Sequence, residues 1–371
     1  MSDLRIDIVL IIYIIICVLM ILFNTAFLIY LRYKDYIFRN KRKKLEDIIK
    51  SQINRIIKNE VIDTKIQEFL FKKLVSIRYL KSFHEIIKNE SKKNETDTFR
   101  YLKKCKPIFE YLLVEFSTKE NAKKAYLAFL ISEFKLCDNL HYDFIVSSMI
   151  SYTMNKSIYV RQNALNALYM SNNSEAILSA IMRMQELKIS HSNKLISDGL
   201  LLFNGDRAEL ASLLWKEFDK FDLNVRIAIV NFIKTASLDY AEEFYQRLTN
   251  KYTHKEVKLS LIRYFGKMIY QPAGDYLITM MKQDTPEWEY KAIAATALAK
   301  YKSQQVIDVL KEALKSDNWY IRFNASESLV AQNIGYMELI DIYNGTDRYA
   351  REILEYKMET SRLKKQAKEG E

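Results

Sequence analysis

The apolar positions of this chain follow three patterns along its length. Residues 8–31 carry no charged side chain and consist mostly of Ile, Leu, Val and Phe. Residues 45–57 place apolar side chains at helical spacing with charged residues between them, which predicts an amphipathic helix with one buried stripe. From about residue 117 a longer period begins, in which a helical apolar pattern recurs every 29 to 33 residues.

The first of these patterns predicts a transmembrane helix at 8–31. Its 24 residues would form a helix of roughly 36 Å, which is enough to cross the hydrocarbon layer with some tilt. A cleaved signal peptide would have a positive start, a shorter apolar run and small residues at its end. Here the preceding residues are net negative and Leu31 is followed by Arg32 and Tyr33, so we expect an uncleaved anchor.

Basic residues crowd the chain directly after the apolar run, where seven cations face Asp35 alone. They are Arg32, Lys34, Arg39, Lys41, Arg42, Lys43 and Lys44. The positive flank of a membrane helix stays in the cytoplasm. This predicts a single-pass protein of the cell membrane, with residues 1–7 outside and residues 32–371 in the cytoplasm. The same basic segment, 32–44, is expected to contact anionic lipid headgroups.

The remaining pattern predicts an all-α fold. The whole chain has only 7 Gly and 3 Pro, too few for the many turns of a sheet protein. Helices are expected within 45–116, with one or two over 61–90, a polar loop at 91–97, and a helix at 99–116 interrupted near Pro107. We expect a repeat region at 117–360 and a charged tail at 361–371.

One basic residue marks the same place in each of seven repeat units. These residues are Arg161, Lys194, Arg226, Lys258, Lys291, Arg322 and Arg351. The residues three and seven positions later are mostly small or apolar and share one helix face. The residues four positions earlier are Ser157, Ser190, Asp222, His254, Glu287, Asn318 and Asp347, five of which are good helix N-caps. Two helices per period, stacked in register, predict an α-solenoid.

These units resemble the HEAT-repeat (armadillo-type) family in its short bacterial form. The clearest are SDNWYIRFNASESL at 316–329, NKSIYVRQNALNAL at 155–168 and FDLNVRIAIVNFI at 221–233. The unit around Lys194 departs from the pattern, with Asp198 and Gly199 at expected apolar positions, so an irregularity or a shifted boundary is expected there. The resemblance implies that the recurrent basic residues form a structural ladder bridging neighbouring repeats.

Sequence motifs for catalysis, cofactors or metals are absent. The chain has no GxGxxG and no GxxxxGK[ST], and no serine-triad order can be recognised. Among its four histidines, His84, His141, His191 and His254, only His141 lies four residues from another His or Cys, namely Cys137, and one such pair is too few ligands for a zinc site. No catalytic residue, cofactor or metal ligand is therefore predicted, and the protein is not expected to be an enzyme.

The charge distribution argues against a nucleic-acid partner. The net charge is +11, of which residues 1–44 supply +5 and residues 45–106 supply +6, so the remaining 265 residues sum to zero. A solenoid that binds nucleic acid should carry its basic excess on the repeats. A scaffold or regulatory subunit that binds a protein partner at the membrane fits better. The resemblance suggests a membrane glycosyltransferase of surface polysaccharide synthesis as that partner.

Two alternatives stay open. Trp215, Trp288 and Trp319 invite comparison with helical-repeat DNA glycosylases, although packing within or between repeats is the simpler use of these side chains. Short bacterial HEAT units also occur in tetrapyrrole lyase-like proteins, but the predicted transmembrane helix argues against that class.

A partner surface is expected on the helix stripe one, five and eight positions after each ladder residue. Its apolar members are Ile227, Leu259 and Phe323, and its polar members are Asn231, Arg263 and Glu327. Exposed apolar residues rimmed by polar ones suit a protein partner. The alternative is that Ile227, Leu259 and Phe323 pack between repeats.

Overall fold

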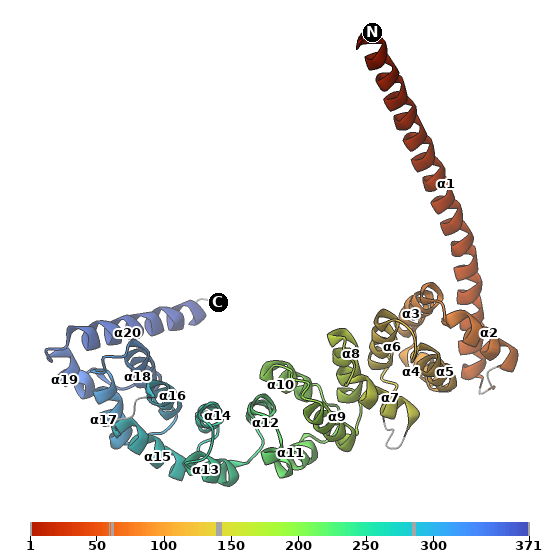
Figure 1. Ribbon diagram of the computed structural model, residues 1–371. Helices are drawn as coiled ribbons and strands as arrows, with labels where there is room; N and C mark the ends of the chain where they lie inside the picture. Colours follow the sequence, from red (N-terminus) through yellow and green to blue (C-terminus); the bar gives the residue numbers. More distant parts are fainter. Residues whose placement is uncertain (1, 59, 61–62, 139–142, 284–286, 370–371) are drawn as a thin grey trace. The chain divides into compact units, whose positions relative to one another are not determined.

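The chain folds into helices throughout the residues that the computed structural model describes, which are 2–58, 60, 63–138, 143–283 and 287–369. Within these ranges it forms twenty α-helices and two short 3-10 helices and no strand, so the predicted all-α fold is confirmed (Figure 1). Residue 1 of the predicted segment 1–7 and residues 370–371 of the predicted tail lie outside them. The chain divides into unit 1 (Met1–Cys137 and Tyr142–Ala167) and unit 2 (Asp138–His141 and Leu168–Glu371).

Unit 1 contains α1 (Ser2–Ile57), α2 (Thr64–Leu74), α3 (Ile77–Ser91), α4 (Glu95–Lys104), α5 (Lys106–Phe116), α6 (Asn121–Glu133), α7 (Phe144–Tyr152) and most of α8 (Ile158–Tyr169). The predicted loop at 91–97 is shorter than expected, because the Asn94 side chain accepts a hydrogen bond from the Asp97 N–H and starts α4 early. The predicted break near Pro107 is confirmed. Pro107 lies in the first turn of α5, where its missing N–H costs no helical hydrogen bond.

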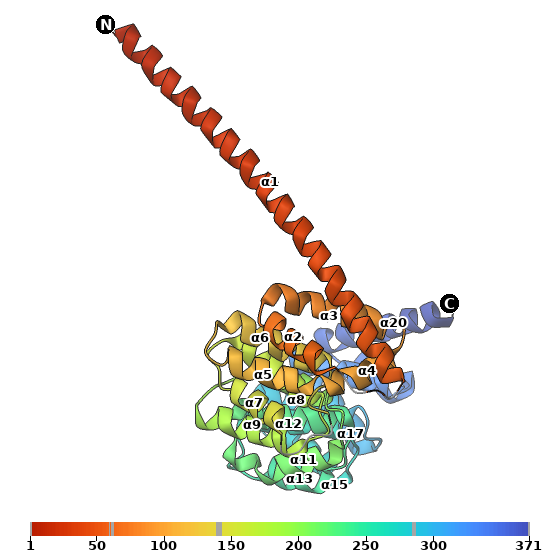
Figure 2. The same ribbon diagram turned by 90° about the vertical axis from the view of Figure 1, so that its right-hand side faces the viewer.

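The first helix joins two of the predicted elements without a break. α1 contains no Gly or Pro and covers both the apolar run and the amphipathic stretch 45–57. Large apolar side chains from Tyr13 to Leu31 are exposed, whereas a stripe of four farther along is at most 7% exposed. That stripe is Leu45, Ile49, Ile53 and Ile56, and this part of α1 packs on α3 and α4 (Figure 2). In the described part of the chain, α1 alone is long and apolar enough to cross a membrane.

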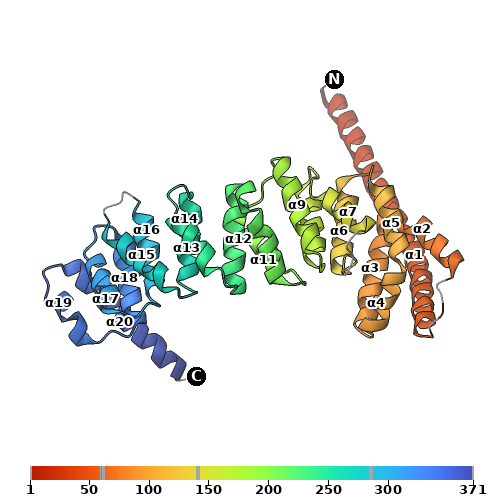
Figure 3. The same cartoon turned by 90° about the horizontal axis from the view of Figure 1, so that it is seen from below.

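Unit 2 is built from helix pairs, as predicted for a solenoid. Its helices are α9 (Ser174–Glu186), α10 (Asn193–Leu201), α11 (Arg207–Lys216), α12 (Leu223–Ala236), α13 (Ala241–Thr249), α14 (Lys255–Phe265), α15 (Gln271–Lys282), α16 (Trp288–Leu298), α17 (Gln304–Ala313), α18 (Trp319–Ala331), α19 (Ile340–Tyr343) and α20 (Arg348–Glu369). The second helices of successive pairs, α10, α12, α14, α16 and α18, pack side by side as an inner row (Figures 1 and 3). The first helices, α9, α11, α13, α15 and α17, form the outer row.

The predicted helix starts are confirmed where the cap residue can accept a hydrogen bond. The Asp222, Asn318 and Asp347 side chains each accept from a backbone N–H in the first turn of α12, α18 and α20. In the Lys194 unit the predicted cap Ser190 is wrong. There Ser192 caps α10, so the helix begins two residues later than the repeat phase indicates.

The irregular glycine of that unit has a packing role. A Cβ on Gly199 would lie 2.2 Å from a ring carbon of Tyr169, so only glycine lets this ring lie against α10. Elsewhere the core follows the predicted register. The residues three and seven positions after Arg226 and Arg322, namely Ile229, Ile233, Ala325 and Leu329, are all 0% exposed.

Candidate partner-binding surface on the inner helix row

The apolar part of the predicted partner stripe is not exposed. Ile227 is 8% and Leu259 is 4% exposed, so the expectation of a free apolar surface at these positions is wrong. The inner-row helices α12 and α14 pack directly on their neighbours, and the position one residue after the ladder falls into this seam. The alternative of packing between repeats therefore describes Ile227 and Leu259.

Phe323 is half-buried beneath side chains from two directions. The Lys357 ammonium of α20 lies 3.4 Å from the centre of its ring, and the Trp319 ring centre lies 4.7 Å away. Lys357 also approaches Glu327 at 3.6 Å. Lys357 thus covers the Phe323 ring and also approaches the Glu327 carboxylate, so Phe323 does not offer a free apolar surface.

The polar members of the stripe remain accessible. Arg263 and Glu327 are exposed and Asn231 is half-buried. The surface that the inner row offers at these positions is therefore polar and charged rather than apolar. A partner would meet it through ion pairs and hydrogen bonds, with the apolar residues beneath acting as support.

Three cations gather where α12 ends beside α14, and we call Lys234, Arg263 and Lys267 the inner cation cluster. Lys267 Nζ donates to the backbone oxygens of Lys234 at 3.0 Å and Thr235 at 3.2 Å, carbonyls at the negative end of α12. Burial lowers the pKa of the Lys234 ammonium, and the positive charges of Arg263 and Lys267 lower it further. An anionic group binding here would relieve this repulsion.

One cation of this cluster lies on the predicted stripe and another lies beside it. Lys234 is eight residues after Arg226, a stripe position, whereas Lys267 is nine residues after Lys258, one position beyond the stripe. Only the packing of α12 on α14 shows that Lys267 reaches across to its neighbour.

Aromatic side chains line the start of the last inner-row helices. Trp288 at the start of α16 stacks on Tyr320 of α18, with ring centres 5.1 Å apart, while Trp319 is 56% exposed. Trp215 instead packs against Phe218 and Phe244 at 4.5 and 5.1 Å. The expected packing role therefore describes Trp215. Trp288 packs between repeats but is still 38% exposed, and Trp319 presents much of its ring to solvent.

The arginines of the ladder fasten the turn that precedes their own helix. Arg226 donates to the backbone oxygens of Asp219 and Phe221, each at 2.7 Å. Arg161 and Arg351 likewise donate to carbonyls of Asn155 and Tyr343. The implied bridge between repeats is present at Arg322, whose guanidinium also reaches Asp347 of the next helix pair at 2.9 Å. The ladder is thus built mainly from bonds within each repeat.

Comparison with known proteins agrees with this architecture. Residues 274–342, which run from α15 to α19, match a family model described as HEAT repeats. This segment is therefore similar to HEAT repeats. No match was found among curated proteins. Among solved structures, a crystal structure of an engineered protein is similar at 14% identity and a TM-score of 0.35, covering 86% of this chain and 94% of that one.

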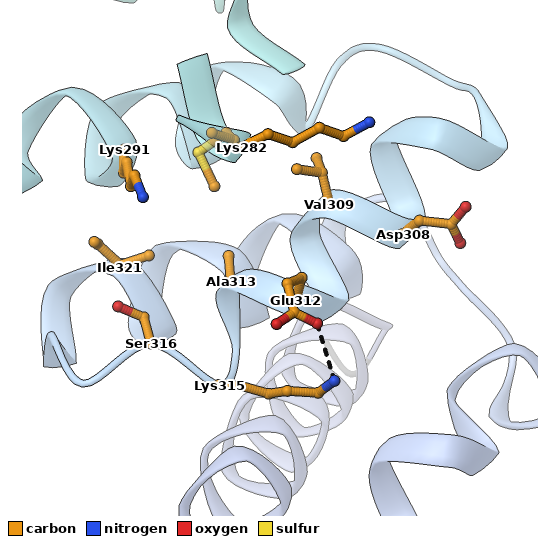
Figure 4. Close-up of a pocket in the computed structure, with 10 residues that line it drawn as sticks. Lys282, Lys291, Asp308, Val309, Glu312, Ala313, Lys315, Ser316 and Ile321 are labelled. Atoms are coloured by element: carbon orange, nitrogen blue, oxygen red, sulfur yellow. Dashed lines mark hydrogen bonds and ion pairs between the residues drawn. The ribbon is translucent and has the colours of Figure 1, made fainter. Parts of the chain in front are cut away.

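A hollow of about 450 Å³ lies within the matched HEAT repeats (Figure 4). Its lining includes Lys291 of the ladder, with Lys282, Val309, Glu312 and Ile321. Glu312 is already paired with Lys315 at 2.9 Å. The described residues contain no group of three or more His, Cys, Asp or Glu side chains arranged to hold a metal ion.

The other lysines of the ladder differ from the arginines in their surroundings. Lys194 is exposed on the irregular helix α10. Lys258 is half-buried, and burial lowers the pKa of its ammonium. A lysine offers one point charge where an arginine offers a planar set of donors, so the turn-fastening bonds of Arg226 have no equivalent geometry at these positions.

The basic segment 32–44 lies wholly on α1, before the repeats begin. Arg42 forms an ion pair with Glu85 of α3 at 2.8 Å, and its six basic neighbours are exposed. The Lys34 ammonium lies 5.6 Å from the Tyr30 ring centre. Long cationic and tyrosine side chains next to an apolar helix are the composition found at membrane interfaces.

Proposed function

We propose that this protein is a membrane-anchored scaffold or regulatory subunit, whose HEAT repeats hold a protein partner at the cytoplasmic face of the cell membrane. One observation carries the proposal. A single unbroken helix, α1, joins an exposed apolar stretch to a stripe buried in unit 1. An exposed surface of large apolar side chains from Tyr13 to Leu31 needs a covering that water does not provide, and a bilayer provides it.

The charge next to this stretch supports the orientation. Six of the seven basic residues at 32–44 are exposed and follow the apolar stretch directly. By the positive-inside rule they keep the repeats in the cytoplasm. In the same position they can contact anionic headgroups.

The partner binds the polar surface of the inner row. HEAT solenoids present extended surfaces for protein partners and generally serve as non-enzymatic scaffolds. The inner cation cluster favours a partner with an acidic segment, because Arg263 and Lys267 crowd Lys234 with like charge. A membrane glycosyltransferase of surface polysaccharide synthesis is the partner class that the family resemblance suggests.

Site-specific photocrosslinking in cells tests this assignment. A photoreactive residue in place of exposed Thr296, on the inner row, should trap one membrane protein. The same residue in place of exposed Glu243, on the outer-row helix α13, is the control and should not. Adding Lys234→Glu and Lys267→Glu should remove the adduct at Thr296. Equal adducts at both positions, or an adduct that survives the charge reversal, would contradict the proposed surface.

A further inference from the structure

We infer that the turn between α2 and α3 is a second lipid-binding element, which holds anionic phospholipid headgroups of the bilayer that contains α1. The inference rests on the proposed membrane anchoring and adds a contact that residues 32–44 do not make. It concerns residues 69–81, which we call the α2–α3 cation turn.

The α2–α3 cation turn carries positive charges that no acidic residue within it balances. Residues 69–81 contain Lys72, Lys73, Arg78 and Lys81 and no Asp or Glu. Lys72, Arg78 and Lys81 are exposed and Lys73 is half-buried. Within the described residues, no carboxylate lies within ion-pairing distance of these four cations.

The far end of the same helix is different. Lys88 pairs with Glu133 at 3.2 Å, and Lys93 pairs with Glu90 at 2.7 Å. Within α3, Lys88 near the C-terminal end is therefore paired, whereas Arg78 and Lys81 near the N-terminal end are not.

The fold sets the unpaired end toward the apolar half of α1. The Phe38 and Tyr79 rings meet with centres 5.5 Å apart, and Arg42 meets Glu85 at 2.8 Å. From Phe38 to Arg42 along α1, the contacted residue moves from Tyr79 to Glu85 along α3. The two helices therefore run in the same direction. The start of α3 is therefore the end that lies closest to the apolar stretch (Figure 2).

The distance along α1 places this end at headgroup depth. Phe38 follows Leu31, the last residue of the apolar run, by seven residues. At the helical rise this is about 10 Å along the axis. The polar headgroup layer extends roughly 5–8 Å beyond the hydrocarbon on each side, and the Debye length at physiological salt is about 8 Å. Cations at the level of Phe38 thus lie at the edge of the headgroups, where the field of anionic lipids is strong.

The turn also contains aromatic residues next to its cations, as segments at the membrane–water interface do. The Lys73 ammonium lies 5.7 Å from the Tyr79 ring centre and 5.9 Å from that of Phe69. The Lys81 ammonium lies 5.9 Å from the ring centre of Tyr126 on α6. Cations held over aromatic rings keep their charge while their stems cover apolar surface. A phosphate group can add to each of them from the open side.

The test measures hydrogen exchange of the full-length protein in nanodiscs, one set of phosphatidylcholine and one of phosphatidylcholine with phosphatidylglycerol. Peptides covering residues 69–81 should exchange more slowly in the anionic discs, by roughly fivefold if one cation contributes the usual attraction near a charged surface. Peptides from α4 should exchange equally in both.

Two matched variants assign the effect. The test variant carries Lys72→Gln, Lys73→Gln, Arg78→Gln and Lys81→Gln. The control variant removes four charges that follow α3 in the sequence, by Lys92→Gln, Lys93→Gln, Lys103→Gln and Lys104→Gln. The lipid-dependent slowing should vanish in the first variant and persist in the second, with unchanged helical content in both.

The outcomes separate this inference from the proposed function. If the full-length protein enters both kinds of disc but residues 69–81 exchange equally in them, the lipid-binding turn is wrong and the anchor stands. If the slowing survives in the test variant, the turn is not its cause and the inference is overturned. If the protein enters neither kind of disc, the anchoring is wrong and the inference fails with it.

Discussion

The two halves of α1 differ in how their apolar side chains are arranged around the helix. From Tyr13 to Leu31 the large side chains point outward on every side and are 37 to 70% exposed, apart from intermediate positions such as Cys17. Between Leu45 and Ile56 four apolar residues, Leu45, Ile49, Ile53 and Ile56, form one stripe that is at most 7% exposed. A helix that is apolar all round needs a surrounding apolar medium, whereas a one-sided stripe needs only a protein neighbour. The periodicity of the apolar residues therefore predicts a helix and also indicates whether an apolar medium or a protein neighbour surrounds it.

The largest expected effect comes from charging the all-round apolar half. Ile16→Asp, Leu19→Asp and Phe23→Asp together should cost roughly 9 kcal/mol of insertion free energy, at about 3 kcal/mol for each Asp near the bilayer centre. The triple variant should leave the membrane fraction on alkaline extraction, whereas Ala at the same three positions should not. A triple-Asp variant that remains in the membrane pellet would remove the distinction between the two halves.

A smaller effect, on a different observable, is expected in the one-sided half. Ile49 is 0% exposed, so Ile49→Asp loses its packing and buries an unpaired carboxylate. This should cost about 4 kcal/mol of unfolding free energy in unit 1. The urea midpoint measured by circular dichroism in detergent should fall, while membrane retention is kept. Asp47→Asn, at an exposed position of the same turn, is the control and should leave the midpoint in place.

The smallest effect is expected on the solvent side of the one-sided half. A hydrogen bond from Lys50 lowers the pKa of Glu46 below its ordinary value of 4.5. Because the folded-state pKa is the lower one, this pair stabilises the fold above pH 4.5 and stops doing so as the pH falls through the folded value. Glu46→Gln should therefore lower the urea midpoint slightly at pH 7 and leave it unchanged in acid below that value. An equal loss at both pH values would show that Glu46 acts through packing.

Local sequence rules accounted for most of the fold. Asp222, Asn318 and Asp347 mark helix starts because a short side chain can accept from free N–H groups, a property visible in one residue. Ser190 does not cap α10, because that helix begins after Ser192, and the same helix holds Gly199 against the Tyr169 ring. That contact joins residues 30 positions apart, and periodicity does not encode it.

The candidate sites depend more on contacts between helices, and the sequence alone predicted them less well. The spacing of residues along one helix does not show whether Leu259 faces solvent or the seam between α12 and α14. Lys267 becomes part of a cluster only because it reaches the carbonyls of Lys234 and Thr235. The α2–α3 cation turn lies more than 30 residues after the apolar run in the sequence. The contact between Phe38 and Tyr79 places this turn beside the part of α1 that follows that run.

The absence of Gly and Pro from α1 has a mechanical consequence. A helix without a kink-forming residue transmits bending and rotation instead of absorbing them at a hinge. Membrane helices respond to bilayer thickness by tilting, on average about 20° from the normal. The buried stripe of α1 is packed in unit 1, so under the proposed membrane anchoring a tilt of the helix would also tilt unit 1. The angle of unit 1 to the membrane surface would then depend on the thickness of the bilayer.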